Sequence, residues 1–302
     1  MKYSVRVWAM GSYPEVDIDE EKFCELKKAR SCLSGALAIE EKYELLLSNY
    51  IDLEKECLSA STDYMVRNAT DYGGFFDIRL AFNRRIVNLL TSTKLYIDQI
   101  QQHVKACICI DIEKRVKSFF STEYDDNFEY RFMEALRNYV QHRGLAVHST
   151  SMGGKRITLE DRDGLEFKTS LFTHKSEVEI DKAFKKQISK EMPDKVNLMY
   201  AARVYVGSIS KIHYEIRNLI KNESEKSRSL ISNTIKNYEK INSSKPIGLY
   251  AICSVPKDPA DETIEKFPLL LDWDDIRLSL IEKNPKMDNL GKRYVSGSAY
   301  NK

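Results

Sequence analysis

One stretch without helix breakers limits the fold more than any other feature of the sequence. No glycine or proline occurs from Phe75 to Ala106. Apolar residues recur there at the spacing of one helix face, at Ile78, Phe82, Ile86, Leu89, Leu90, Ile97 and Ile100. The spacing predicts a long amphipathic helix, and the rest of the chain shares its composition. Only 12 Gly and 7 Pro occur among 302 residues, which favours helix throughout.

Composition bounds the class of protein. Hydrophobic residues make up 42% of the chain and charged residues 30%, the balance of a globular protein with a sizeable core. The net charge of +2 excludes a uniformly basic nucleic-acid coat, so any phosphate binding must use a local patch. We predict no membrane span, because no apolar run approaches about 18 residues. Arg6 interrupts the first apolar run, so we expect no secretion signal and a cytoplasmic location.

Further elements are predicted from periodicity and from breakers. Residues 2–9 alternate as a strand, and Asp17 or Asp19 is expected to cap a helix that ends near Cys32, before a break at Ser34-Gly35. Other expected elements are a helix over 36–58, a loop at Gly73-Gly74, a short helix over 112–120, a hairpin over 155–172 turning at Asp163-Gly164, a helix near 177–191, a helical region from Pro193 to Asn242 that lapses at 223–228, a strand over 248–255 and a helix over 273–282.

We therefore predict a mainly α (α+β) fold, with a β-hairpin inserted between helical parts and a C-terminal half of long helices. The expected division is a strand and helix over 1–35, a helical bundle over 36–150, and the hairpin with the helical C-terminal region over 151–302.

Cysteines and acidic clusters do not predict a metal site. Cys107 and Cys109 lack a second pair of ligands nearby, so we interpret them as buried thiols rather than zinc ligands. The acids of DWDD, 272–275, precede a helix and are expected to cap it. No cofactor is predicted. His103, His174 and His213 lack partners close in sequence and are expected to be structural.

The stretch RNYVQH, 137–142, suggests chemistry. It closes a helix that should begin at Asp125-Asp126 and stop at Gly144. On a helical wheel the apolar arc, expected to face the core, contains Phe128, Phe132, Met133, Leu136, Tyr139 and Val140. Asn138 and His142 lie one turn apart on the polar side, with Arg131 and Glu134.

Arg137 lies about 140° from His142 on an ideal helix, so the two do not meet automatically. They could meet if the last turn unwinds, or if a second chain presents its own copy across a two-fold axis. Histidine can accept and donate a proton near neutral pH, and arginine offers a fork to a phosphate. With Asn138 these groups could cleave RNA without a metal, using the ribose 2′-OH as the nucleophile.

A structural interpretation of the same residues is also open. Glu134 and Arg137 have the i,i+3 spacing of a common surface ion pair, and His142 could cap the carbonyls at the end of the helix. Arg143 and His148 repeat the spacing of the motif, but Gly144 should break any helix between them.

RNYVQH resembles the Arg-x4–6-His motif of the HEPN superfamily, in which a polar residue often follows the arginine, as Asn138 does here. The resemblance covers roughly residues 36–150 and implies a HEPN-like helical bundle. It also implies a metal-independent endoribonuclease that works as a homodimer, as a toxin or anti-phage defence effector. Carried over by position, Arg137 and His142 are catalytic and Asn138 assists. A non-catalytic HEPN-like binding or dimerisation module is the alternative.

The expected partners follow from that resemblance. They are RNA such as tRNA or mRNA, a second copy of the chain, and an antitoxin or regulatory partner. A lysine cluster near 182–190 could contact an RNA backbone or form an ordinary solvated helix face; it comprises Lys182, Lys185, Lys186 and Lys190.

Overall fold

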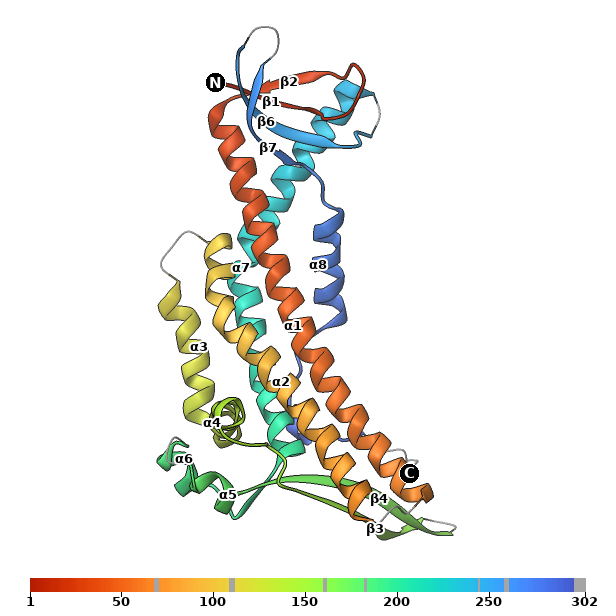
Figure 1. Ribbon diagram of the computed structural model, residues 1–302. Helices are drawn as coiled ribbons and strands as arrows, with labels where there is room; N and C mark the ends of the chain where they lie inside the picture. Colours follow the sequence, from red (N-terminus) through yellow and green to blue (C-terminus); the bar gives the residue numbers. More distant parts are fainter. Residues whose placement is uncertain are drawn as a thin grey trace. The chain divides into compact units, whose positions relative to one another are not determined.

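The computed structural model describes residues 1–67, 71–108, 112–159, 162–181, 184–243, 245–257 and 261–295. The fold is mainly α with small antiparallel sheets, as predicted (Figure 1). The helices of the described residues are α1 (Glu20–Arg67), α2 (Tyr72–Cys107), α3 (Glu113–Asp126), α4 (Phe128–His142), α5 (Lys175–Glu179), α6 (Lys186–Glu191), α7 (Leu198–Asn242) and α8 (Asp272–Lys283). The strands are β1 (Lys2–Val7), β2 (Glu15–Ile18), β3 (Ser149–Leu159), β4 (Arg162–His174), β5 (Lys195–Asn197), β6 (Leu249–Val255) and β7 (Glu262–Pro268).

The chain forms two compact units, each assembled from segments distant in sequence. The first unit comprises residues 1–41, 99–114 and 215–285. The second comprises 42–98, 115–214 and 286–302. Helices α1, α2 and α7 contribute residues to both units. The division into 1–35, 36–150 and 151–302 stays a prediction.

The first unit contains a four-stranded antiparallel sheet in the order β2-β1-β6-β7 (Figure 1). The predicted N-terminal strand is confirmed, and Val5 and Val7 are buried in the core. The alternation is incomplete, because Ser4 is buried as well. Strand β6 contributes Leu249, Ala251 and Cys253 to the same core, and the sheet packs on α1 and α7 through a cluster that includes Phe23, Leu26, Ile231 and Tyr238. The short strands β2 and β7 were not predicted.

The second unit carries the β3–β4 hairpin, to which β5 adds a third antiparallel strand. The hairpin was predicted, but the position of its turn was wrong. Asp163 pairs with Thr158 and Gly164 with Ile157, so both lie within the ladder. Residues 160–161, which join the two strands, lie outside the described residues. The hairpin packs on the C-terminal part of α1, where Ser61 donates a 3.0 Å hydrogen bond to Thr169 of β4.

Helices α1 and α7 are joined by arginine–glutamate pairs within each unit. In the first unit, Arg217 donates Nε and Nη2 to the two carboxylate oxygens of Glu40 at 2.8 and 2.5 Å. In the second, Arg203 holds Glu54 by the same two nitrogens at 2.7 and 2.8 Å. Glu40 is only 1% exposed. Because a buried carboxylate without a partner is very costly, these pairs specify which helix faces meet.

The expected helix break at Ser34-Gly35 was wrong, because α1 is continuous through both residues. Gly35 serves a packing role instead. A Cβ built on it would lie 2.7 Å from the backbone oxygen of His103 and 2.9 Å from Cβ of Ala106. The helices α1 and α2 therefore approach each other here more closely than any residue with a side chain would permit.

The expected lapse over 223–228 was also wrong, since α7 continues without interruption. The polar residues of this stretch find partners. The Ser224 hydroxyl donates to the carbonyl of Ile220 at 2.9 Å. Arg228 donates to Asp274 and Asp275 of α8 at 2.6 and 2.5 Å. Arg228 at the end of this stretch thus contacts α8, while Glu225 and Lys226 are exposed. The same pairing corrects the interpretation of DWDD, because Asp274 and Asp275 bind Arg228 and no side chain caps the start of α8.

Several predicted element boundaries were displaced. Gly73-Gly74 lie in the first turn of α2, where the Gly74 N–H is capped by Asp71 at 3.0 Å. Asp125-Asp126 end α3 and do not begin α4. The helix expected near 177–191 is divided into α5 and α6, and α7 starts at Leu198, after β5. The cap at Asp19 is confirmed, because its carboxylate accepts the Lys22 N–H at 2.7 Å.

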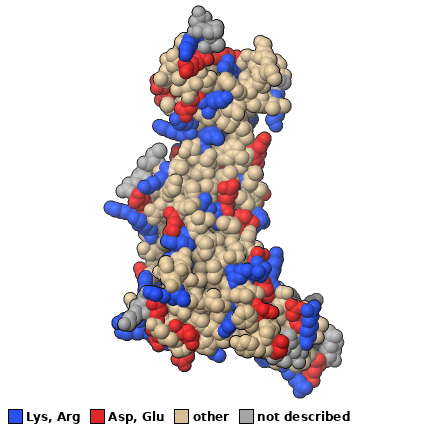
Figure 2. All heavy atoms as spheres, viewed as in Figure 1, with Lys and Arg blue, Asp and Glu red and all other residues tan. Residues whose placement is uncertain are grey.

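Figure 2 shows lysine and arginine interspersed with aspartate and glutamate on the face it draws, in keeping with the small net charge. No helix within the described part of the chain combines the length and the apolar character that crossing a membrane requires.

We predict that Gly35→Ala destabilises the protein. Alanine improves helix propensity by up to about 1 kcal/mol, but the overpacked contact with the α2 backbone should cost about 1–3 kcal/mol. Gly207→Ala is the matched control, because its Cβ would meet only Leu290, at 3.5 Å. Urea unfolding should give a lower free energy for Gly35→Ala and an equal or higher one for Gly207→Ala. Equal gains in both would show that the α1–α2 contact is loose.

Candidate functional site

Helix α4 carries the RNYVQH stretch and is strongly amphipathic. Phe132, Met133 and Leu136 are fully buried, as the wheel predicted. The buried arc is displaced from the predicted one, however, because it includes Tyr130 and Arg137, whereas Tyr139 and Val140 are only partly buried.

Arg137 belongs to an internal polar network. Its Nη1 donates to Glu134 at 2.7 Å and its Nη2 donates to Oδ1 of Asn138 at 3.1 Å. The other oxygen of Glu134 accepts a short hydrogen bond from the Tyr205 hydroxyl of α7. Burial, followed by the Glu134 carboxylate, raises the pKa of Tyr205 well above its ordinary value, so this hydroxyl remains a donor. Only 8% of Arg137 is exposed, which makes the pair with Glu134 an interior one, not a surface one.

Asn138 and His142 differ from Arg137 in being exposed. His142 is the last residue of α4, so the helix does not unwind before it. Within the described residues, His142 makes no hydrogen bond or ion pair with Arg137 or Asn138. The structure therefore brings together Arg137 and Asn138, while His142 stands one turn away on the open side of the helix.

The end of α4 is fixed by close packing at Gly144. The N–H groups of Arg143 and Gly144 both donate to the carbonyl of Tyr139, at 2.8 and 3.3 Å. Gly144 was expected to end the helix, and it does so without a left-handed backbone. A Cβ at this position would lie 2.5 Å from the Tyr139 hydroxyl oxygen, so any larger residue would force that ring to move.

The chain after Gly144 is held firmly against α2 and β4. Asn83 of α2 accepts the Val147 N–H at 2.8 Å and donates to the Val147 carbonyl at 3.2 Å. The Thr173 hydroxyl donates to Ala146 at 2.6 Å. These bonds place His148 on the edge of the Tyr139 ring, with ring centroids 6.2 Å apart.

Two further histidines lie together in this region, which was not predicted from the sequence. His148 and His174 have ring centroids 6.3 Å apart at an interplanar angle of 21°. The His174 backbone N–H donates to Nδ1 of His148 at 3.0 Å, and the Ser149 hydroxyl lies 2.6 Å from Nε2 of His174. Burial lowers the pKa of His148 below 6.5. The only available signal was the hairpin, since two residues that flank a hairpin become neighbours across its ladder.

His213, by contrast, is a core residue, as expected. It is 1% exposed, stacks on Tyr43 at 3.8 Å between ring centroids, and its Nδ1 lies 3.0 Å from the Tyr96 hydroxyl.

The structure describes three of the four lysines in the predicted cluster. Lys182 lies outside the described residues. Lys185 donates to the Tyr124 hydroxyl at 2.8 Å and stands over that ring, and Lys186 and Lys190 are exposed on α6. Beside them is a cavity of about 340 Å³ with mixed charge, lined by Tyr124, Asp125, Arg131, Lys185, Gln187, Ile188 and Glu191. Arg131 is bound there to Glu191 at 2.7 Å.

The chain was compared with protein-family models, curated proteins and solved structures, and none of them matches it. The resemblance to the HEPN superfamily thus stays a prediction that rests on the motif and its helical setting.

We predict that Arg137→Met lowers the free energy of unfolding by about 3 kcal/mol, because it leaves the Glu134 carboxylate without its cation in a largely buried site. His142→Ala, on the exposed side of the same helix, should change it by less than about 0.5 kcal/mol. Urea unfolding of both variants checks this. An Arg137→Met protein as stable as the parent would show that the guanidinium is free for another task.

We also predict a pH effect from His148. Because its folded-state pKa is depressed, the unfolded chain takes up the proton first, so stability is complete above pH 6.5 and falls as pH decreases through that value. His148→Gln should flatten this slope, and His142→Gln should retain it. Unfolding at several pH values between about 7.5 and 5 measures the slopes. Equal slopes in the parent and His148→Gln would contradict the prediction.

Proposed function

We propose that this protein is a metal-independent endoribonuclease that acts as a homodimer through the exposed end of α4. The observation that carries the proposal is the hydrogen bond from Arg137 to Oδ1 of Asn138, at 3.1 Å, one turn from the exposed His142. The bond leaves both N–H donors of the Asn138 amide for another acceptor, such as a phosphate oxygen.

In this proposal the three residues have different roles. His142 transfers the proton, because imidazole can act as either base or acid near neutral pH. One copy removes the proton of the ribose 2′-OH, which attacks the phosphorus, and the copy from the second chain protonates the departing 5′ oxygen. Asn138 holds the phosphate. Arg137, being buried, is a positioning residue that acts through Asn138.

A second function is favoured by a specific observation. Arg137 is committed to Glu134, and such an interior pair needs no substrate to explain it. In that case α4 belongs to a non-catalytic helical module, whose exposed residues Asn138 and His142 contact another chain.

The test is cleavage of end-labelled total RNA and tRNA by the purified protein in EDTA. We expect the parent to cleave and His142→Ala to lose about 10²–10⁴-fold in rate, the usual contribution of a general acid or base. Asn138→Ala should lose activity without losing stability. Gln141→Ala, an exposed neighbour on the same turn, is the matched control and should cleave like the parent. Substrates with 2′-deoxy sugars should resist.

RNA cleavage and the oligomeric state, measured together on the same variants, separate the two functions. A dimer that cleaves RNA only with an intact His142 supports the nuclease. Equal cleavage by the parent and His142→Ala would place the activity elsewhere. A protein without cleavage that remains dimeric, with the dimer weakened by Asn138→Ala or His142→Ala, would support the binding module.

A further inference from the structure

Two buried cysteines lie beside the close approach of α1 and α2 at Gly35. Cys32 of α1 is 4% exposed and Cys107 of α2 is 7% exposed. The Cys107 sulfur lies 3.2 Å from the carbonyl oxygen of Cys32 and 3.4 Å from that of His103. Cys107 was expected to be a buried thiol, and its partner was not foreseen.

Gly35 explains why Cys107 can lie so close to Cys32. It lies one turn after Cys32, and its Cβ position is 3.3 Å from the Cys107 sulfur. Because the backbones pack this closely, the Cys107 sulfur lies against the backbone of Cys32 on the facing helix. The contact between Cys107 and Cys32 thus depends on the packing of α1 against α2.

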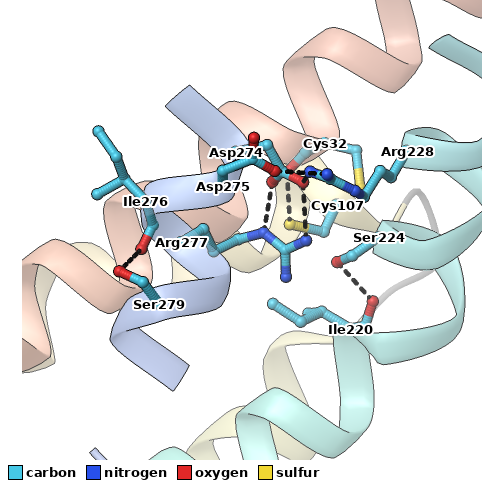
Figure 3. Close-up of polar contacts among 10 residues, drawn as sticks. All are labelled: Cys32, Cys107, Ile220, Ser224, Arg228, Asp274, Asp275, Ile276, Arg277 and Ser279. Carbon is cyan, nitrogen blue, oxygen red and sulfur yellow. Dashed lines mark hydrogen bonds and ion pairs between the residues drawn. The ribbon is translucent and has the colours of Figure 1, made fainter. Parts of the chain in front are cut away.

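Charged residues of α7 and α8 lie close to the two cysteines (Figure 3). Asp274 is fully buried and accepts hydrogen bonds from Arg228 and Arg277, each at 2.6 Å. Figure 3 shows Arg277 beside Cys107, with Asp274 above it. The Arg277 guanidinium opposes the rise in the pKa of Cys107, but the pKa of this thiol is raised overall.

Hydrogen bonding shifts the pKa values of the two thiols in opposite directions. The hydrogen bond from Cys107, followed by those from Ser227 and Ser224, lowers the pKa of Cys32 to about 7 against the opposing effect of burial. The same bond raises the pKa of Cys107. One sulfur is therefore prepared to attack as a thiolate, while the other retains its proton.

We propose that Cys32 and Cys107 form a redox-reactive dithiol, which small hydroperoxides oxidise to an intramolecular disulfide that joins α1 to α2. This inference is independent of RNA cleavage, because the pair lies in the first unit and Asn138 and His142 lie in the second.

The chemistry requires only the peroxide as oxidant. The Cys32 thiolate attacks one peroxide oxygen, the O–O bond breaks, and the leaving oxygen takes a proton to become water or an alcohol. Cys32 is then a sulfenic acid. The Cys107 sulfur attacks the Cys32 sulfur, the S–O bond breaks, and the hydroxide leaves as water with the Cys107 proton. In sum, two thiols and one hydroperoxide give one disulfide, one water and one water or alcohol.

The burial of the two thiols predicts which oxidants react with them. Hydrogen peroxide is small and should reach the thiols, whereas a bulky disulfide such as oxidised glutathione should be excluded. Cys57 is a natural comparison, because burial raises its pKa to about 11 and it contacts the Thr169 carbonyl instead of another thiol.

The experiment treats the reduced full-length protein with hydrogen peroxide and, separately, with oxidised glutathione. It uses a Cys109→Ser background, because Cys107 and Cys109 share one tryptic peptide. We expect peroxide to remove two hydrogens from the intact mass and to link peptide 31–42 to peptide 106–114. The oxidised protein should melt several degrees higher than the reduced one, and dithiothreitol should reverse the shift.

Variants identify the sulfurs. Cys32→Ser and Cys107→Ser should both abolish the link, and Cys57→Ser should keep it. Cys107→Ser should also accumulate a Cys32 sulfenic acid that a 1,3-diketone reagent traps. The proposal is overturned if peroxide leaves the mass of the Cys109→Ser protein unchanged, if the link joins other cysteines, or if oxidised glutathione reacts as fast as peroxide. The first and third of these outcomes need no further variant, so a misfolded serine protein cannot hide the answer.

Discussion

The buried arginine–glutamate pairs between α1 and α7 are the constraint on which the rest of the structure depends. Glu40 with Arg217, and Glu54 with Arg203, are separated by the same number of residues along both helices, so each unit uses the same antiparallel register. Hydrophobic side chains tolerate small shifts of register, but a buried carboxylate does not, because a misplaced partner leaves a charge without solvation. The pairs thus specify the register of helices whose apolar faces alone would allow several.

Once that register is set, the remaining polar groups of the interior follow. In the second unit Tyr205 of α7 is presented to Glu134, and Glu134 in turn holds Arg137. In the first unit Arg228 of α7 meets Asp274, which also binds Arg277 next to Cys107. Both candidate sites therefore draw part of their chemistry from α7. Their reactive groups, Asn138 and His142 in one and the two thiols in the other, are supported by interior charge pairs and do not take part in them.

The α4 site shows how much of a candidate site a sequence motif can predict. The residue types and spacing of RNYVQH placed Arg137, Asn138 and His142 on one helix that ends before Gly144, and α4 agrees with that. Spacing could not say that Arg137 would be interior, because its burial depends on Tyr205, which lies far away in sequence. A wheel treats a charged residue as solvent-facing, whereas a guanidinium with a carboxylate partner can be covered.

The sequence by itself determined the mainly helical class, the N-terminal strand, a helix cap at Asp17 or Asp19, the hairpin and most of the apolar face of α4. These depend on periodicity and on capping, which act over a few neighbouring residues. Tertiary structure alone decided that Gly35 would join two helices and not break one, that residues 223–228 would continue α7, and that Cys32 would meet Cys107. Each of these depends on what packs opposite the residue, and the free energy of a close contact or a buried charge belongs to the pair and not to either residue alone.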